Sequence, residues 1–349
     1  SGLVCKMIIR ETKHFLTLAV SIIVAGAALR PEQILAEARR VKYLSGNQYL
    51  IVEFLDDDLA HFELSASGPG PDVHKPIFTT PMVHKTDYPG PSHLTDDGNG
   101  TLETPEMKVV VDTRSLCVSV TDKTQDPDLV LTTICPRNLD QERKGITITP
   151  ESFTHVYGLG QQFITAGSAD GDWVGRVRSP GGPFGNAMTG WNGGAVGNTQ
   201  FPIAYFLGSD TDSYALFLDS PYKQTWDFTG QPWKVEMGGE ALRFYILTGP
   251  DLQDLRKDYM ELTGRPPVPP KKMFGLWVSE YGFDDWAELD DKLRTLRANH
   301  FPMDGFVLDL QWFGGIVKGS DDSPMGGLNW DLQNFPDPKG KIAHLWAEA

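Results

Sequence analysis

The sequence has little positive charge, few cysteines and almost no long hydrophobic runs. Its 31 lysines and arginines face 46 aspartates and glutamates, so the formal net charge is −15. A polyanion would be repelled by this charge, and we therefore exclude nucleic acid as a partner. Three cysteines make neither a disulfide framework nor a zinc cluster. Glycine (36) and proline (25) are plentiful but follow no strict period, which excludes collagen and predicts many short strands.

Two of the cysteines, Cys117 and Cys135, lie in segments that have the pattern of strands. They would pair as a disulfide if the protein is exported, because disulfides persist in oxidising compartments. The alternative is two buried free thiols, and the residues themselves do not decide between the two.

The one long apolar run covers residues 15–28 and follows Lys6, Arg10 and Lys13. It is too short for a transmembrane helix, which needs about 20 apolar residues. A basic lead, a short apolar stretch and small residues at its end are typical of a secretory signal. We therefore expect residues 1–32 to be a targeting segment of an exported protein, periplasmic or secreted. The alternative is an ordinary buried or interfacial helix. No other run is long enough to span a membrane.

Residues 33–250 have the pattern of an antiparallel β-sandwich. Residues 49–54 and 60–64 flank the turn-forming Asp56, Asp57 and Asp58, which predicts a hairpin. Residues 108–111 and 116–120 form a second pair of this kind. Further strands are predicted at 146–149, 203–207, 214–218 and 242–246. Short strands at this spacing favour a sandwich.

The glycine-rich stretch 181–197 is not a phosphate-binding loop. It contains no GxxxxGK[ST] motif, and no helical pattern follows it. We expect a long surface loop that covers a site.

The periodicity changes after residue 250. Leu252, Leu255, Tyr259 and Leu262 mark one face of a helix that Gly264 ends. Residues 265–270, rich in proline, form a stiff linker, so residues 251–270 are a helix and a linker.

Residues 271–349 begin an α/β domain. Residues 273–278 and 304–310 are apolar runs typical of strands buried on both faces. Between them an amphipathic helix carries Trp286, Leu289 and Leu293. Strand, helix and strand in this order predict a βαβ unit. A complete (β/α)₈ barrel needs about 250 residues, so a barrel that begins here would be truncated after about two strands.

Six segments, in consistent order over residues 45–349, resemble glycoside hydrolase family 31, the α-glucosidase and α-xylosidase group. Tyr157-Gly-Leu-Gly160 resembles the family's YGLGE motif, with Gln161 where glutamate is usual. The other matching segments are 214–219, 249–267, 274–283, 301–309 and 330–338.

The resemblance implies a retaining α-glycosidase with a galactose-mutarotase-like β-sandwich in front of a (β/α)₈ TIM barrel. It implies a carbohydrate substrate and neither a metal nor an organic cofactor. The family's nucleophile and acid/base are aspartates that end strands four and six, so both are expected beyond Ala349. This chain alone would then carry no catalytic residue. An α-transglycosylase on the same site and a non-catalytic carbohydrate-binding module are the alternatives.

The resemblance supplies only substrate-binding residues within this chain. Asp309 matches an aspartate that binds sugar hydroxyls, and strand ends carry the active sites of such barrels; the alternative is a loop cap. Tyr281 matches an aromatic residue that stacks on a sugar ring. Gln311 and Trp312 occupy positions where the family commonly has aspartate and tyrosine, and packing is their alternative role. Trp191 and Asn186, in the glycine-rich loop, complete the set.

Other carboxylates have simpler interpretations. Asp56, Asp57 and Asp58 form a solvated turn, and Asp284 and Asp285 cap the following helix.

Overall fold

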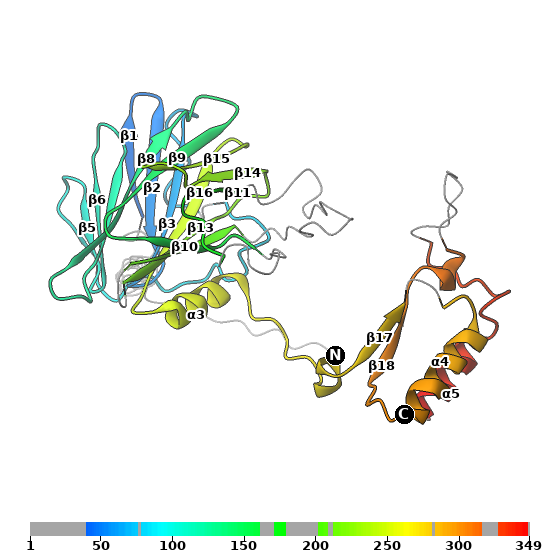
Figure 1. Cartoon of the computed structure of the whole chain (residues 1–349). Coiled ribbons are helices and arrows are strands. Elements are labelled where there is room, and N and C mark those ends of the chain that lie inside the picture. The colour runs from blue at the N-terminus through cyan, green and yellow to red at the C-terminus, as the bar shows by residue number, and fades with distance from the viewer. Residues whose placement is uncertain are drawn as a thin grey trace, which may run out of the picture. The chain divides into compact units, whose positions relative to one another are not determined.

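The computed structural model describes residues 40–75, 78–160, 171–178, 202–208, 212–280, 283–315 and 327–347. The chain divides into two compact units, Ser1–Arg265 and Pro266–Ala349 (Figure 1). The predicted targeting segment and the glycine-rich stretch lie outside the described residues.

The described part of unit 1 contains two sheets in which all paired strands are antiparallel. The seven-stranded sheet has, in spatial order, β1 (Arg40–Ser45), β2 (Gln48–Phe54), β3 (Leu59–Ser65), β16 (Leu242–Thr248), β13 (Ser213–Leu218), β12 (Ile203–Leu207) and β10 (His155–Gly158). The nine-stranded sheet has β11 (Val177–Arg178), β14 (Gln224–Asp227), β15 (Trp233–Met237), β9 (Lys144–Pro150), β8 (Leu129–Arg137), β7 (Val118–Asp122), β6 (Met107–Val111), β5 (Thr101–Glu103) and β4 (Thr95–Asp96). The two predicted hairpins are confirmed as β2–β3 and β6–β7.

One core joins the two sheets. Alternate residues of β2 and β6, such as Leu50, Val52, Val109 and Val111, belong to the same buried cluster. The period-two pattern places these side chains on the inner face, where burial stabilises each by about 1.5–3 kcal/mol.

Helix α3 (Leu252–Thr263) packs on the outer face of the seven-stranded sheet, where Leu255 and Leu262 join Phe217 in a second buried cluster. The Asp251 carboxylate caps the helix by accepting the N–H groups of Gln253 and Asp254. Gly264 ends it with φ at 90°, a conformation that favours glycine. The predicted helix and both of its ends are confirmed.

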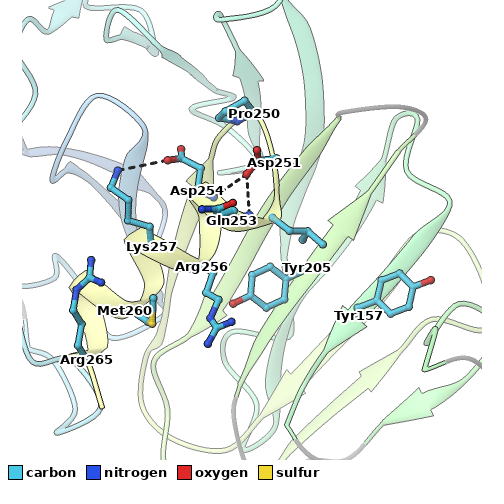
Figure 2. Close-up of a pocket in the computed structure, with 11 residues that line it drawn as sticks. Tyr157, Tyr205, Pro250, Asp251, Gln253, Asp254, Arg256, Lys257, Met260 and Arg265 are labelled. Carbon is cyan, nitrogen blue, oxygen red and sulfur yellow. Dashed lines mark hydrogen bonds and ion pairs between the residues drawn. The ribbon is translucent and has the colours of Figure 1, made fainter. Parts of the chain in front are cut away.

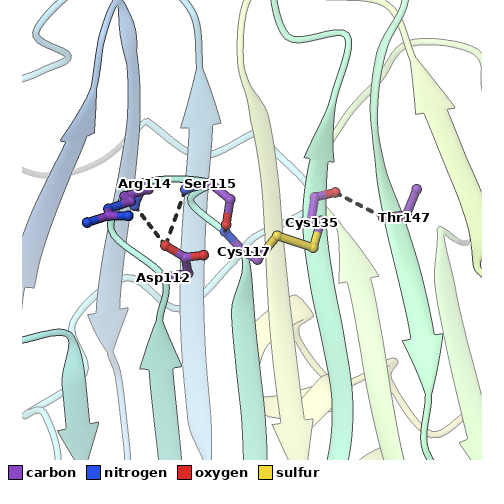
Figure 3. Close-up of a disulfide and its surroundings, with 6 residues drawn as sticks. All are labelled: Asp112, Arg114, Ser115, Cys117, Cys135 and Thr147. Carbon is purple, nitrogen blue, oxygen red and sulfur yellow. Dashed lines mark hydrogen bonds between the residues drawn. A yellow bond between two sulfur atoms is a disulfide. The ribbon is translucent and has the colours of Figure 1, made fainter.

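A disulfide joins Cys117 and Cys135, which lie opposite each other on the β7 and β8 side of the nine-stranded sheet (Figure 3). Their Cα atoms are 4.1 Å apart. Of the two alternatives that the sequence left open, the structure therefore contains the disulfide rather than two buried thiols.

Unit 2 opens with the predicted βαβ unit. The turn η1 (Lys271–Phe274) precedes β17 (Trp277–Glu280), α4 (Trp286–Ala298) and β18 (Gly305–Leu308), and the two strands pair in parallel. After β18 come η2 (Gln311–Phe313) and α5 (Pro338–Ala347). No described helix has the length and apolar character that crossing a membrane requires.

The prediction that both strands are buried on two faces was wrong for these residues. Phe306 and Leu308 pack against Phe283 and Trp286 on one side of the strand pair. On the other side Val307 is 43% exposed, because nothing in the described part of unit 2 covers it. The apolar run also begins as a 3₁₀ turn, so β17 starts four residues later than predicted.

Candidate functional site

The candidate site lies at the carboxyl ends of β17 and β18. In the parallel register Glu280 pairs with Leu308, so both strands end at the same edge. Asp309 follows directly, and its neighbours along the chain form η2. In barrels of parallel strands this edge carries the active site.

Asp309 is exposed, although the run 304–310 that contains it was predicted to be buried on both faces. Within the described residues its carboxylate has neither a hydrogen bond nor an ion pair. A loop cap would accept backbone N–H groups from the residues that follow, as Asp285 does at the start of α4. The geometry thus leaves both oxygens of Asp309 available to a ligand.

Trp312 takes part in packing. Its ring centroid lies 5.0 Å from that of Trp330 and 5.2 Å from that of Phe313. Its carbonyl accepts the N–H of Asp331 at 2.8 Å, which ties η2 to the segment before α5. These contacts agree with packing, the alternative role that the sequence left open for Trp312. The side chain is only half-buried, so part of it remains exposed to solvent.

Gln311 lies beside Gly315, whose φ is 73°. A Cβ atom on Gly315 would meet the Gln311 Oε1 atom at 2.5 Å, so this close approach requires glycine. Gln311 is half-buried and is the first residue of η2, two positions after Asp309.

The other predicted site residues, Tyr281, Trp191 and Asn186, lie outside the described residues. Glu280, which precedes Tyr281, is 3.8 Å from the ammonium group of Lys292 on α4. The structure therefore brings Asp309, Gln311 and Trp312 together and leaves the rest of the set as a prediction.

Sequence reasoning missed an acidic cluster in unit 1. Carboxylate oxygens of Asp58, Asp254 and Asp258 all lie within 4.8 Å of one another. Asp58 is half-buried, so its assignment to a solvated turn was wrong. The spacing of Asp254 and Asp258, four residues apart on a helix, puts them on one face and was the available signal.

Burial and like charge change the titration of this cluster. Burial raises the pKa of Asp58 to about 7, and the nearby carboxylates of Asp258 and Asp56 add to the rise. Burial likewise raises the pKa of Asp258 to about 6, with a further contribution from Asp254. The folded protein therefore holds protons on these acids that the unfolded chain releases near pH 4.

We expect the contribution of this acidic cluster to the stability of unit 1 to fall as the pH rises. An acid whose pKa is raised by folding stabilises the fold below its unfolded pKa, and this contribution is lost between about pH 4 and about pH 7. Asp58→Asn removes one titrating group. Over this pH interval, the melting temperature of the variant should therefore fall by about 2–4 °C less than that of the wild type. Differential scanning calorimetry across the pH range measures this. Asp128→Asn, an exposed aspartate outside the cluster, should behave like wild type. Equal slopes for wild type and Asp58→Asn would contradict the prediction.

Comparisons with known proteins agree with this geometry. Residues 266–349 match the sequence model of the "Glycosyl hydrolases family 31 TIM-barrel domain". The α-xylosidase XylQ of Lactiplantibacillus pentosus is 26% identical over 198 residues, which cover 54% of this chain and 23% of that protein. Alpha-glucosidase 2 of Bacillus thermoamyloliquefaciens is 29% identical over 144 residues, which cover 40% of this chain and 17% of that protein. The chain thus spans less than a quarter of the length of these relatives.

Two further proteins extend the comparison. The isomaltosyltransferase of Sporosarcina globispora is 28% identical over 122 residues, which cover 33% of this chain and 11% of that protein. Among solved structures, the GH31 dextranase of Flavobacterium johnsoniae, complexed with glucose, matches with a TM-score of 0.68 and 17% identity. That match covers 88% of this chain and 36% of the dextranase, and at this identity it shows the fold alone.

The fold and the match define a class: a unit of antiparallel β-sheets followed by a segment similar to the barrel domain of family 31 glycoside hydrolases. The resemblance seen in the sequence is confirmed, and the chain is a relative of the family 31 glycosidases.

Proposed function

We propose that the complete protein is a retaining α-glycosidase that acts on α-linked glucosides or related glycans. The observation that carries this proposal is the unpaired Asp309 carboxylate at the carboxyl end of β18, in a segment that matches the family's barrel domain. Asp309 would accept hydrogen bonds from sugar hydroxyls, and Tyr281 would stack on the sugar ring.

In such an enzyme one carboxylate attacks the anomeric carbon while a second protonates the leaving oxygen. The two lie about 5 Å apart, because the nucleophile must reach the sugar carbon directly. The resemblance places both on barrel strands beyond Ala349. Gln311 and Trp312 would shape the sugar site, while Trp191 and Asn186 would approach it from the glycine-rich loop.

The experiment that tests this function follows the product anomer. The complete protein, with 4-nitrophenyl α-glucoside or α-xyloside as substrate, should release the α-anomer first, as seen by proton NMR before mutarotation. Initial release of the β-anomer would contradict a retaining mechanism. Absence of turnover on both substrates and on longer α-glucans would contradict the assignment as a glycosidase.

A transglycosylase is the second candidate, favoured by the similarity to an isomaltosyltransferase. It would use the same site and exclude water from the second step. Addition of maltose as an acceptor separates the two, because a transglycosylase should make more transfer product than free sugar.

We also propose that the protein is exported. The disulfide between Cys117 and Cys135 supports this, because such bonds are rare in reducing compartments. Retention of residues 1–32 on protein isolated from the periplasm or medium would contradict their assignment as a cleaved signal.

A further inference from the structure

A groove runs along the outer face of the seven-stranded sheet, beside the first turn of α3 (Figure 2). It consists of two hollows of about 1080 and 480 Å³. Both are lined by Tyr157, Asp251, Leu252 and Gln253, so they adjoin and share a wall. Each is large enough for a small organic ligand.

Aromatic rings line one side of this groove. Tyr157 of β10 and Tyr205 of β12 are partners in the antiparallel register, so their side chains project from the same face of the sheet. Both are half-buried. The ring of His155, two residues before Tyr157, lies 6.2 Å from it and is stacked at 26°. The three rings follow one another across the edge strand β10 and its neighbour β12.

Three charged groups that line the groove, Arg256, Arg265 and Asp212, have no partner within the described residues. The Arg256 guanidinium, on α3, makes neither an ion pair nor a hydrogen bond there, and Figure 2 shows it beside Tyr205. The Asp212 carboxylate, in the second hollow, likewise has no side-chain hydrogen bond or ion pair in the described part of the chain. By contrast, Asp251 is occupied as the helix cap and Asp254 contacts Lys257.

These groups select the chemistry of the ligand. An anion would be attracted by the guanidinium groups of Arg256 and Arg265 in the first hollow but repelled by the Asp212 carboxylate in the second, and a cation would be repelled by the first two and attracted by the third. A neutral ligand with many hydroxyl groups satisfies both kinds of group, since a hydroxyl donates to a carboxylate and accepts from a guanidinium. Tyrosine rings favour a ligand with flat apolar faces, which a pyranose presents through its C–H groups.

We propose that this groove is a carbohydrate-binding site that holds a neutral α-linked gluco-oligosaccharide. The sugar rings lie on Tyr157 and Tyr205, Arg256 donates to their hydroxyls, and Asp212 accepts from them. The choice of glucose rests on the proposed function, whereas the groove belongs to unit 1 and contains none of the barrel residues.

Isothermal titration calorimetry on the 349-residue chain tests the site, with maltoheptaose and isomaltopentaose as probes. We expect saturable binding of at least one. Tyr157→Ala and Arg256→Gln should each weaken it about tenfold, the equivalent of about 1.4 kcal/mol. The matched controls are Tyr222→Ala, a tyrosine that is 53% exposed outside the groove, and Arg114→Gln, an exposed arginine of the β6–β7 turn. Both should bind like wild type.

Several outcomes would overturn the proposal. These are the absence of saturable binding to both oligosaccharides, equal binding by wild type and Arg256→Gln, or displacement of the sugar by inorganic phosphate. Because Arg256 is exposed, Arg256→Gln should keep the fold. Its binding affinity therefore tests the proposal even if Tyr157→Ala fails to fold. Turnover of 4-nitrophenyl α-glucoside by the complete protein does not depend on this groove, so a failure here leaves the proposed activity standing.

Discussion

Replacement of Asp309 by asparagine should lower kcat/KM of the complete protein by about two to four powers of ten. An ionised carboxylate that accepts two sugar hydroxyls makes charge-assisted hydrogen bonds, worth about 1.5–3 kcal/mol each. Part of this energy should appear only as the sugar ring flattens toward its oxocarbenium-like transition state. Asparagine keeps the shape of the side chain and removes its charge. Steady-state kinetics with 4-nitrophenyl α-glucoside measure the loss.

Two further measurements identify the role of Asp309. Asp284→Asn, an exposed carboxylate just before α4, is the matched control and should retain wild-type kinetics. Azide should not restore activity to Asp309→Asn, because rescue by a small nucleophile marks a missing catalytic carboxylate. Near wild-type activity of Asp309→Asn would show that Asp309 does not bind the sugar and is only part of the loop after β18. Azide rescue with formation of an inverted glycosyl azide would instead make it the nucleophile.

The 349-residue polypeptide by itself should not hydrolyse α-glycosides. The resemblance places both the nucleophile and the acid/base outside these residues, and a polypeptide without them should be slower by several powers of ten. Within unit 2, the carboxylates nearest the described strand ends are Glu280, which lies beside Lys292, and Asp309. Neither occupies a position where the resemblance puts a chemical carboxylate.

A sensitive assay of released 4-nitrophenol, with a heat-killed sample as reference, measures this. The Asp309→Asn form of the same polypeptide identifies contaminating host glycosidase, because a contaminant would be equally active in both preparations. Turnover that wild-type polypeptide shows and this variant lacks would place the chemistry within these residues and contradict the assignment of the catalytic pair.

The sequence predicts the parts of the fold whose signals are local. Period-two alternation identifies β2 and β3, and an N-terminal cap with a terminal glycine identifies α3. Strand β14, with four residues and two buried side chains, was missed because so short a strand depends on its neighbours more than on its own pattern. Strand β15 was also missed, although Trp233, Val235 and Met237 alternate with polar residues and carry a period-two signal.

The candidate site could be predicted only in part, for the same physical reason. The position of Asp309 after a strand is a local property, and the structure reproduces it. Its exposure is a property of what packs around it, which no local pattern contains. The cluster of Asp58, Asp254 and Asp258 joins a β-turn to a helix that is distant in sequence, so neither segment alone reveals the contact.

The bridge between Cys117 and Cys135 has a practical consequence for the recombinant protein. The two residues are 18 positions apart, and closing a loop of this size restricts the unfolded chain by about 3 kcal/mol on the chain-entropy account. A chain synthesised in a reducing bacterial cytosol, or purified with a thiol reductant, would lack this contribution. Expression in an oxidising host and reductant-free buffers are therefore the conditions under which this protein should reach its full yield and its highest melting temperature.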